Sequence, residues 1–385
     1  MKSNFFLIFI SIVLTIYTSA NYYIFIRGWQ SLEKFQSLRI PYLILFLIVC
    51  FSYIIHIVFF RSNPTSFGNI FTYIGSYWFG AMLYFFLLIV LFDFLRLINH
   101  FFPFFPYIIS SNYPSAKFYT AISSVITVII VLTAGYINAI NPIVKELNIS
   151  ISKTAGKLKK LRAVIISDVH IGNIIDNGRV TKLVKSINEL NPDIVLFAGD
   201  ILDEEVQSVL KNDSGIPLKN LKSKYGVYAI PGNHEYIAGA ERALKYIRTL
   251  NINLLVDSIA EIDNSFYIIG RDDRDGFRFA GKKRKQLDSL IENLDKTKPM
   301  ILLDHQPLHL EDAERAGIDL QFSGHTHNGQ IFPINLITKK IYEQDFGFLR
   351  KGSTQYYVSC GYGTWGPPLR LGNRPEIVLC HIKFK

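Results

Sequence analysis

Five short groups of residues with metal-binding side chains follow strand-like segments in the second half of the chain. Asp168 and His170 form a D-x-H pair directly after the apolar run 163–167, and Gly199-Asp200 follows the run 194–198. The other groups are Gly232-Asn233-His234-Glu235 after 227–230, His305 after 300–303, and Gly324-His325-Thr326-His327 after 320–322. Because the carboxyl ends of strands in open α/β sheets gather ligands in one crevice, we expect these groups to converge.

Together the five groups predict a divalent metal centre, although each alone is weak. A D-x-H or G-D pair arises by chance in many chains, and a single histidine after a strand is more often an ordinary polar residue than a ligand. Of the nine histidines, five fall inside the groups, and the others are His56, His100, His309 and His381. This mixture of nitrogen and oxygen donors suits Mn, Fe or Zn. It lacks the sulfur that is usual in a closed structural zinc site.

The ordered groups resemble the calcineurin-like metallophosphoesterase superfamily, over about residue 161 to the C-terminus. The resemblance implies a two-sheet β-sandwich flanked by helices, with two metal ions at one edge. It implies that Asp168, His170 and His327 hold one ion, that Asn233, His305 and His325 hold the other, and that Asp200 bridges both. It also implies that His234 lies over the phosphate, where it would stabilise the transition state or protonate the leaving oxygen. The alternative role for His234 is to orient Asn233.

Two metal ions explain why such a donor set would serve phosphoryl transfer. Ions about 3.5 to 4 Å apart can lower the pKa of a shared water, hold it in line with phosphorus and neutralise the non-bridging oxygens. Asp200 is suited to bridging because a carboxylate has two oxygens. Asn233 adds a neutral oxygen donor without adding negative charge.

The same half of the chain alternates β-rich runs with amphipathic segments, which predicts an α/β layered domain. Further strands are expected at 266–269, 356–359 and 377–382, and helices at 179–190, 240–250 and 285–294. There is no internal repeat or low-complexity tract.

Residues 1–140 have the composition of a transmembrane region. Their only acids are Glu33 and Asp93, and four apolar stretches at about 5–26, 41–60, 70–97 and 118–138 approach or exceed the ~20 residues that cross a bilayer. The first stretch could instead be a signal peptide, but it lacks a small-residue cleavage site and further spans follow. Asp93 lies near Arg96, and we expect an ion pair at the end of a span rather than a functional carboxylate inside it.

A basic juxtamembrane linker is expected at 141–160, before a metallophosphoesterase domain at 161–385. The distribution of lysine and arginine favours a cytoplasmic catalytic domain in this multi-pass protein. The cluster from Lys153 to Arg162 could hold anionic lipid or could be a solvated linker. The formal net charge of +10 does not by itself predict nucleic-acid binding, because no basic motif is interleaved with aromatic residues. Cys50, Cys360 and Cys380 form no disulfide framework, and the sequence does not indicate an oligomeric state.

Two further segments have open interpretations. The tail from Gly361 to Arg370, followed by Arg374 to Ile377, resembles a bacterial membrane-associated subgroup of the superfamily. Its Trp365 and Leu369 could touch lipid, and Arg370 or Arg374 could bind a phosphate, or the loop could merely close the sheet. The charges of the run Arg271 to Asp275 could likewise line a cleft or cap a loop.

The leading functional hypothesis is a membrane-anchored hydrolase that cleaves a phosphoester or pyrophosphate of a lipid or lipid-linked precursor, with UDP-2,3-diacylglucosamine as one specific substrate by analogy. A soluble phosphodiester such as a cyclic nucleotide is the alternative substrate. A catalytically silent metal-binding sensor or scaffold is a third hypothesis, against which the intact ligand set and His234 argue. A transporter is disfavoured because the spans contain almost no ionisable residues.

Overall fold

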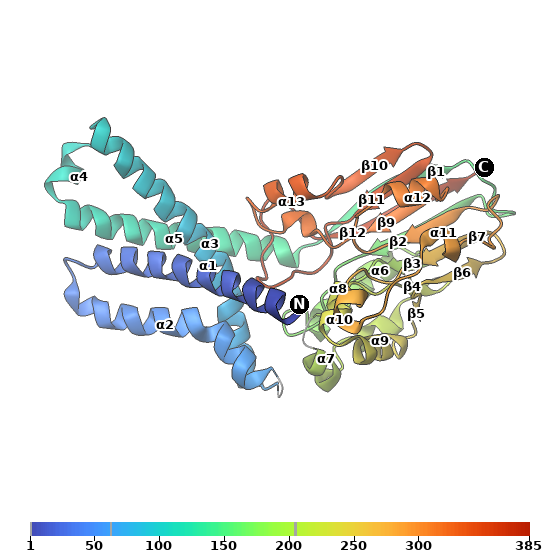
Figure 1. Cartoon of the computed structure of the whole chain (residues 1–385), viewed down its shortest axis with the longest axis horizontal. Coiled ribbons are helices and arrows are strands. Elements are labelled where there is room, and N and C mark those ends of the chain that lie inside the picture. Colours follow the sequence, from blue (N-terminus) through green and yellow to red (C-terminus); the bar gives the residue numbers. More distant parts are fainter. Residues whose placement is uncertain (1, 62–63, 204–205) are drawn as a thin grey trace. The chain divides into compact units, whose positions relative to one another are not determined.

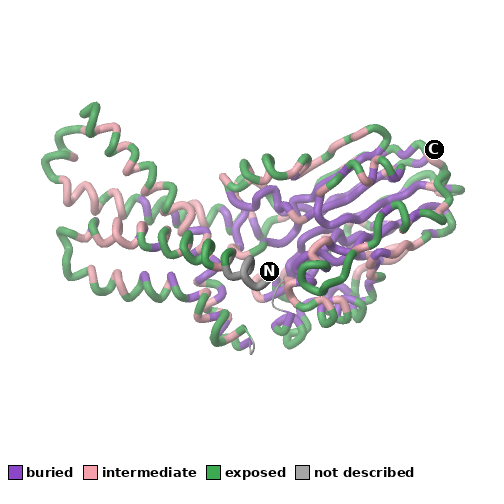
Figure 2. The backbone as a smooth tube through the Cα atoms, viewed as in Figure 1, coloured by how far each residue is buried: buried purple, intermediate pink, exposed green. Residues whose placement is uncertain are grey.

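The computed structural model describes residues 2–61, 64–203 and 206–385, and for residues 2–7 and 9 it describes the backbone alone. The chain divides into two compact units, Met1–Gly135 and Tyr136–Lys385. Figure 2 contrasts them: buried residues are sparse along the helices of the first unit and concentrated in the strands of the second. The strand-rich second unit contains all five groups of predicted metal ligands.

The first unit is helical (Figure 1). Among the described residues, three helical segments are long and apolar enough to cross a membrane: Gln36–Phe60, Ser66–Phe101 and Tyr113–Ile140. They correspond to η1 (Gln36–Leu38), α2 (Arg39–Ile55) and η2 (His56–Phe60), to α3 (Ser66–Phe101), and to α5 (Tyr113–Ile140), with the short α4 (Tyr107–Ser111) before α5. The first expected span, 5–26, lies within α1 (Lys2–Ser31), and part of it falls outside the residues whose side chains are described.

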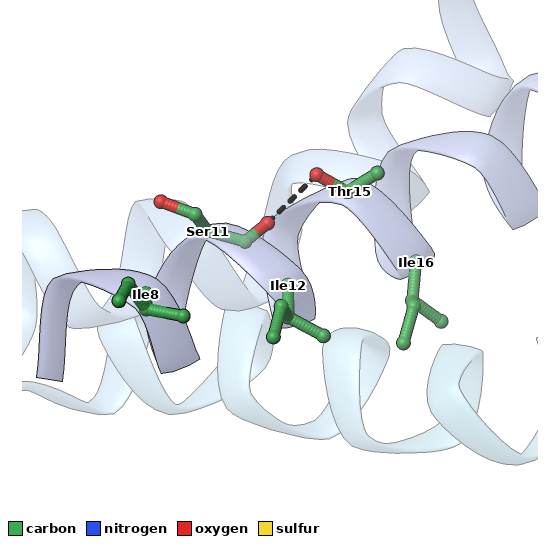
Figure 3. Close-up of a pocket in the computed structure, with 5 residues that line it drawn as sticks. All are labelled: Ile8, Ser11, Ile12, Thr15 and Ile16. Atoms are coloured by element: carbon green, nitrogen blue, oxygen red, sulfur yellow. Dashed lines mark hydrogen bonds between the residues drawn. The ribbon is translucent and has the colours of Figure 1, made fainter. Parts of the chain in front are cut away.

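Apolar side chains on α1 suit a lipid environment. Ile8, Ile12 and Ile16 recur every four residues, are exposed, and line a shallow pocket (Figure 3). In the same pocket the Thr15 hydroxyl donates to the carbonyl of Ser11 at 2.7 Å, so this polar group is satisfied within the helix. Asp93 of α3 accepts a hydrogen bond from Arg96 at 3.1 Å, which confirms the expected pair.

The second unit contains two mixed six-stranded sheets, and the predicted α/β class with two sheets is confirmed. The first sheet has the order β1 (Ile143–Ile151), β12 (Glu376–Phe384), β2 (Lys160–Ile166), β3 (Ile194–Phe197), β4 (Val227–Ala229) and β5 (Asn253–Leu254). The second has the order β10 (Gly347–Lys351), β11 (Thr354–Val358), β9 (Leu320–Ser323), β8 (Met300–Leu303), β7 (Phe266–Gly270) and β6 (Ser258–Ile262).

Parallel pairing directs the functional strand ends to one edge of each sheet. β2, β3 and β4 run parallel in the first sheet, and β7, β8 and β9 run parallel in the second. Along β2, Val164 and Ile166 join one apolar cluster while Ala163 and Ile165 join another, as the period of two in a strand requires. The second cluster also includes Ile268, Leu303 and Phe322 of the other sheet, so it fills the space between the two sheets.

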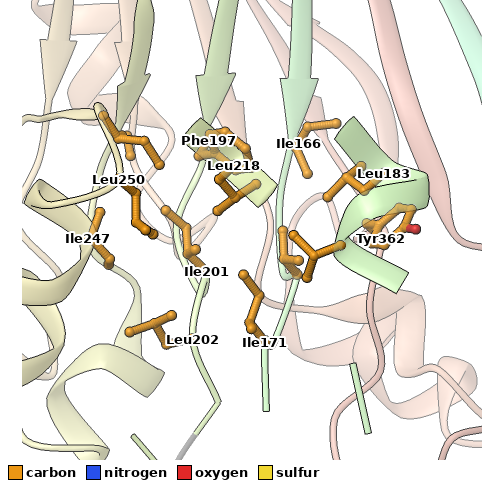
Figure 4. Close-up of a cluster of buried hydrophobic side chains, with 14 of the residues drawn as sticks. Ile166, Ile171, Leu183, Phe197, Ile201, Leu202, Leu218, Ile247, Leu250 and Tyr362 are labelled. Atoms are coloured by element: carbon orange, nitrogen blue, oxygen red, sulfur yellow. The ribbon is translucent and has the colours of Figure 1, made fainter. Parts of the chain in front are cut away.

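Helices and short helical turns connect the strands of the second unit. They are α6 (Asn177–Glu189), α7 (Val206–Asn212), η3 (Ile216–Asn220), α8 (Asn233–Ile237), α9 (Ala240–Arg248), α10 (Gly276–Ala280), α11 (Leu287–Leu290), α12 (Glu311–Arg315), η4 (His327–Gly329) and α13 (Asn335–Ile341). α6 begins where Asp176 accepts from the Arg179 N–H at 3.0 Å, and it buries Leu183 against the first sheet together with Phe197 and Leu250 (Figure 4). Each such fully buried side chain stabilises the fold by about 1.5–3 kcal/mol relative to exposure.

Three expected segments differ from the structure. Ile143–Ile151 lies inside the expected linker 141–160 but forms β1, since it can pair with β12 over nine residues. The helix expected at 285–294 is reduced to α11 (Leu287–Leu290). The strand expected at 356–359 begins earlier, as Thr354–Val358. For the two strands, pairing with neighbouring strands sets the bounds in place of the local pattern.

Candidate metal centre

The structure brings the seven predicted ligand side chains together at the carboxyl ends of five strands. β2, β3 and β4 supply residues from the first sheet, and β8 and β9 supply residues from the second. All but His325 are buried, and His325 is partly buried. The donors are Asp168, His170, Asp200, Asn233, His305, His325 and His327.

The first group of donors consists of Asp168, His170 and His327. Nε2 of His170 lies 3.0 Å from Nε2 of His327, and the latter atom lies 3.4 Å from Oδ1 of Asp168. Nε2 of His170 is 4.0 Å from the same carboxylate oxygen. Donor atoms that share one ion at about 2.0–2.3 Å have to lie roughly 3–4 Å from one another. The first group therefore has the spacing of a metal site.

The second group consists of Asn233, His305 and His325, and Asp200 lies between the two groups. Oδ1 of Asn233 is 3.2 Å from Nε2 of His305 and 2.8 Å from Nδ1 of His325. Oδ2 of Asp200 is 3.0 Å from Nε2 of His305 and 3.9 Å from Nε2 of His170. The Asp200 carboxylate is thus within reach of both groups.

Left-handed backbone is concentrated at these residues. Asp168, His170 and Asp200 each have φ of 52°, and His325 and His327 have φ of 72° and 49°. Residues other than glycine rarely adopt this region, and the strain costs on the order of 1–3 kcal/mol per residue. Such strain persists where the surrounding fold fixes it, and it is typical of functional sites.

Two motif glycines are required by close approach. A Cβ on Gly232 would collide with the Asp200 carboxylate, and a Cβ on Gly324 would collide with Ser167 and Asp168. The loops after β4 and β9 therefore pass directly against the carboxylates of the loops after β3 and β2. Any larger residue at these positions would displace a predicted metal ligand.

Burial sets the protonation of the histidines. It lowers the pKa of His170 and of His325 to about 3, and it holds the pKa of His327 well below its usual value, with Arg370 adding to the effect. Neutral imidazole is the form that offers a lone pair to a metal. Although burial acts against it, Asp200 holds the pKa of His305 well above its usual value.

The two carboxylates of the site behave differently. Burial raises the pKa of Asp168 to about 6, partly offset by His305. Burial also acts to raise the pKa of Asp200, but His305 and His234 hold it well below its usual value. Asp200 consequently remains ionised between the two groups, as a bridging ligand has to be.

His234 is set apart from the two donor groups. Its backbone N–H donates to Oδ1 of Asp200 at 2.9 Å, and its ring is perpendicular to that of His170 with centroids 4.5 Å apart. Nδ1 of His234 lies 3.5 Å from Oδ1 of Asp203, which is also 3.8 Å from Nδ1 of His170. Asp203 belongs to none of the groups predicted from the sequence, although it lies three residues after Asp200, and that position is a signal that could have found it.

Glu235 joins two of the motif loops. Its carboxylate accepts from the N–H of Leu202 at 2.8 Å and from the N–H of Gly232 at 2.7 Å. Burial raises its pKa to about 7, and the charge of Asp200 adds to the shift. Glu235 therefore fixes the loop after β3 to the loop after β4, a role that its place in the motif did not disclose.

The tail loop contacts the site through Arg370. This residue is fully buried, and it donates to the carbonyls of Gly363 at 2.6 Å and of His327 at 3.1 Å. It cannot bind an external phosphate, as one interpretation of the sequence suggested. Leu369 is likewise buried and cannot touch lipid, whereas Trp365 is exposed with its ring 6.2 Å from that of His234.

The run Arg271 to Asp275 is mainly structural. Arg271 donates to the carbonyl of Lys285 at 2.9 Å, and Arg274 donates to that of Leu308 at 2.8 Å. Asp273 accepts from the Gln306 side chain at 3.0 Å, beside the metal-ligand position His305, and burial raises its pKa to about 7. These charges hold loops in place around the site.

The donor set fits divalent ions. Three groups of His and acidic residues in the described part of the chain have ligand atoms close enough to hold an ion: Asp168, His170 and His327; Asp200, His305 and His325; and His170, Asp203 and His234. The first two contain only residues that the sequence analysis selected. Imidazole nitrogens and carboxylate oxygens that converge in this way are donors that Mn, Fe and Zn accept.

Comparison with known proteins gives the family. Residues 161–329 match the family model described as calcineurin-like phosphoesterase. An uncharacterized metallophosphoesterase of Campylobacter jejuni is 30% identical over 99% of both chains. One from Helicobacter pylori is 35% identical over 63% of this chain, and a transmembrane protein with metallophosphoesterase domain from Danio rerio is 30% identical over 70%. The chain belongs to the calcineurin-like metallophosphoesterase family.

The chain spans about two thirds of the length of two of these relatives. The match covers 64% of the length of the Helicobacter protein and 64% of that of the Danio protein. Among solved structures, the 5'-nucleotidase precursor from Thermus thermophilus has a TM-score of 0.35 and 14% identity, over 57% of this chain and 54% of that chain.

Proposed function

We propose that the protein is a membrane-anchored phosphohydrolase that cleaves a phosphoester or pyrophosphate bond with two divalent metal ions. The observation that carries this proposal is the position of Asp200, whose Oδ2 lies 3.0 Å from His305 and 3.9 Å from His170. A carboxylate between two donor groups is the arrangement that a dinuclear centre needs. Membership of the metallophosphoesterase family supports the same reaction class.

Each side chain has a distinct part in this proposal. Asp168, His170 and His327 would hold one ion, Asn233, His305 and His325 the other, and Asp200 both. Bound divalent ions supply Lewis acidity, which polarises a phosphoryl oxygen and lowers the pKa of water. The chain's own residues fix the positions at which phosphate oxygens and water can be held, because their loops are locked by Glu235 and the motif glycines.

His234 would protonate the leaving oxygen or stabilise the charge that develops on phosphate. Its backbone is held by Asp200, and its Nδ1 faces Asp203 at 3.5 Å. A carboxylate at Nδ1 favours the proton on that nitrogen and orients Nε2 for the substrate. In either role of His234, Asp203 would be its positioning residue.

The proposed substrate is a phosphorylated lipid or a lipid-linked precursor such as UDP-2,3-diacylglucosamine. The candidate membrane helices would keep the enzyme at a lipid surface, and the exposed Trp365 beside His234 offers an apolar contact next to the reacting phosphate. A soluble phosphodiester is the second candidate, because the same indole could stack on a nucleobase. We also propose that the catalytic unit faces the cytoplasm, as the distribution of basic residues indicates.

The test is hydrolysis of bis-p-nitrophenyl phosphate by the full-length protein in detergent, stripped with chelator and then titrated with Mn, Fe(II), Zn or Mg. We expect activity that returns with metal and is absent from Asp200→Ala, which should also bind less metal. Asp295→Ala is the matched control, since Asp295 is exposed and its carboxylate accepts hydrogen bonds from nearby Thr297. Bound metal without turnover of this probe or of lipid phosphates would favour a silent metal-binding module instead.

A further inference from the structure

An apolar surface lies next to the metal centre on α13. Helix α13 has no buried residue, yet three of its seven positions are the apolar Leu336, Ile337 and Ile341. Ile337 and Ile341 are four residues apart and therefore share one face of the helix. Ile334 before the helix and Trp365 of the tail loop are exposed as well, the indole to 53% and Ile341 to 63%. We call these five residues the apolar lip.

The apolar lip is fastened to the loop that carries His325 and His327. Asp345 accepts from Thr338 of α13 at 2.8 Å through its side chain and from Thr326 through its backbone carbonyl. Gln330 bonds to both backbone groups of Trp365, each at 2.8 Å, and its N–H donates to the carbonyl of His327. Whatever binds the apolar lip is therefore held beside the metal ligands.

We propose that the apolar lip inserts into the surface of an anionic lipid bilayer, so that the metal centre receives a phosphate at the headgroup level. This inference rests on the proposed function and specifies how that site meets its substrate. Lys339 and Lys340 are exposed on the same helix, whose sequence contains no acid. Lysines can bind the negatively charged headgroups of such a bilayer, while the apolar residues beside them enter the layer of acyl chains.

A bilayer suits this surface better than a protein partner does. The chain contains segments long and apolar enough to span a membrane, so a bilayer is always within reach of the second unit. A helix of seven residues is too short to present a large recognition surface, but its apolar side chains can enter the headgroup boundary. The substrate class is consequently an amphiphilic phosphate whose chains remain in the bilayer during hydrolysis.

The first test locates the apolar lip without depending on activity. A nitroxide is attached to Ile337→Cys in the full-length protein, reconstituted in nanodiscs of phosphatidylcholine with phosphatidylglycerol. Ile216→Cys is the control, because Ile216 is an exposed apolar residue of η3. We expect oxygen to relax the label at 337 more than a water-soluble nickel complex does, and the reverse at 216. Equal access of the nickel complex to both positions would overturn the proposal, as would protection of 337 from both reagents, which indicates cover by protein.

The second test separates this inference from the reaction itself. Rates are compared on hexadecyl 4-nitrophenyl phosphate in nanodiscs and on soluble bis-p-nitrophenyl phosphate, which share a leaving group. For Ile337→Asp with Ile341→Asp we expect the ratio of lipid to soluble rate to fall on the order of tenfold, and for Ile216→Asp no change. An unchanged ratio would overturn the docking proposal. If neither substrate is hydrolysed, the proposed function is wrong. The nitroxide measurement at position 337 still shows whether the apolar lip lies in the bilayer.

Discussion

Oδ1 of Asp203 lies 3.5 Å from Nδ1 of His234 and 3.8 Å from Nδ1 of His170, at the edge of the candidate metal centre. The pair of Asp203 and His234 links a residue of the β3 loop to one of the β4 loop. The carboxylate can keep a proton on Nδ1 and stabilise the ring when it becomes charged. Several consequences of the site geometry can be measured.

Asp203→Asn should lower kcat without removing metal. The amide cannot stabilise a charged imidazole, and loss of such a partner typically costs about 10–100-fold in activity. Steady-state rates and metal content of the purified variant check this expectation. Asp203→Glu should recover part of the rate, whereas loss of both ions from Asp203→Asn would make this residue a ligand rather than a positioning residue.

His234→Gln should retain both ions and lose about 10²–10⁴-fold in turnover. The loss of turnover should be smaller for a substrate whose leaving group is p-nitrophenolate, which leaves readily. It should be larger for a substrate whose leaving group is an alkoxide, because an alkoxide needs a proton. Comparing aryl and alkyl phosphodiesters measures the difference. If His234 only oriented Asn233, the variant would lose metal and both substrates would slow equally.

Arg370→Ala should destabilise the second unit by about 2–5 kcal/mol. The substitution removes the Arg370 donor from the buried carbonyl of Gly363 and one of several donors from that of His327, and it opens a cavity in the tail loop. Chemical denaturation followed by fluorescence measures the free energy of unfolding. Arg370→Lys should rescue little because it lacks the planar fork. Arg374→Ala is the control, since Arg374 is exposed, and a stable Arg370→Ala with only weaker substrate binding would contradict this role.

Asp319 should make the stability of the second unit depend on pH. Burial raises the pKa of Asp319, although Lys153 at 2.8 Å acts to lower it. Because the folded pKa lies above the unfolded value near about 4, its stabilising contribution is complete below that pH and is lost as pH rises through the folded pKa. The thermal midpoint of Asp319→Asn should therefore fall less over this rise than that of the unmodified protein. Lys153→Met should enlarge the fall, and identical pH profiles for all three proteins would contradict the assignment.

The orientation of the protein can be measured by cysteine labelling. A cytoplasmic second unit requires that Lys157→Cys react with a membrane-impermeant maleimide only after cells are opened. Both Lys157 and Lys34 are exposed, so neither label is blocked by burial. Lys34→Cys should react from outside intact cells, because three of the four predicted spans lie between position 34 and position 157. Labelling of position 157 from outside would reverse the orientation.

The polar residues that follow apolar runs were accessible from the sequence because a strand and the loop after it are local features. This is why the groups at Asp168, Asp200 and His325 could be selected before their convergence was observed. The roles of Asp203 and Arg370 could not, since they depend on which loops approach one another in space. β1 was missed because most of its residues are exposed, and only the short alternation at Leu147, Ile149 and Ile151 faces the apolar cluster between the sheets.

Strand β1 also has a mechanical consequence. Only Asn141 and Pro142 separate it from the last helix of the candidate membrane region, and it pairs in parallel with β12 from Ile143 opposite Glu376 to Ile151 opposite Phe384. A pull on β1 that is directed along the strand acts on its nine-residue pairing with β12. The backbone hydrogen bonds then bear the load together in shear instead of opening one after another. The pairing of β1 with β12 therefore resists a pull along the strand better than a pull that opens the hydrogen bonds one at a time.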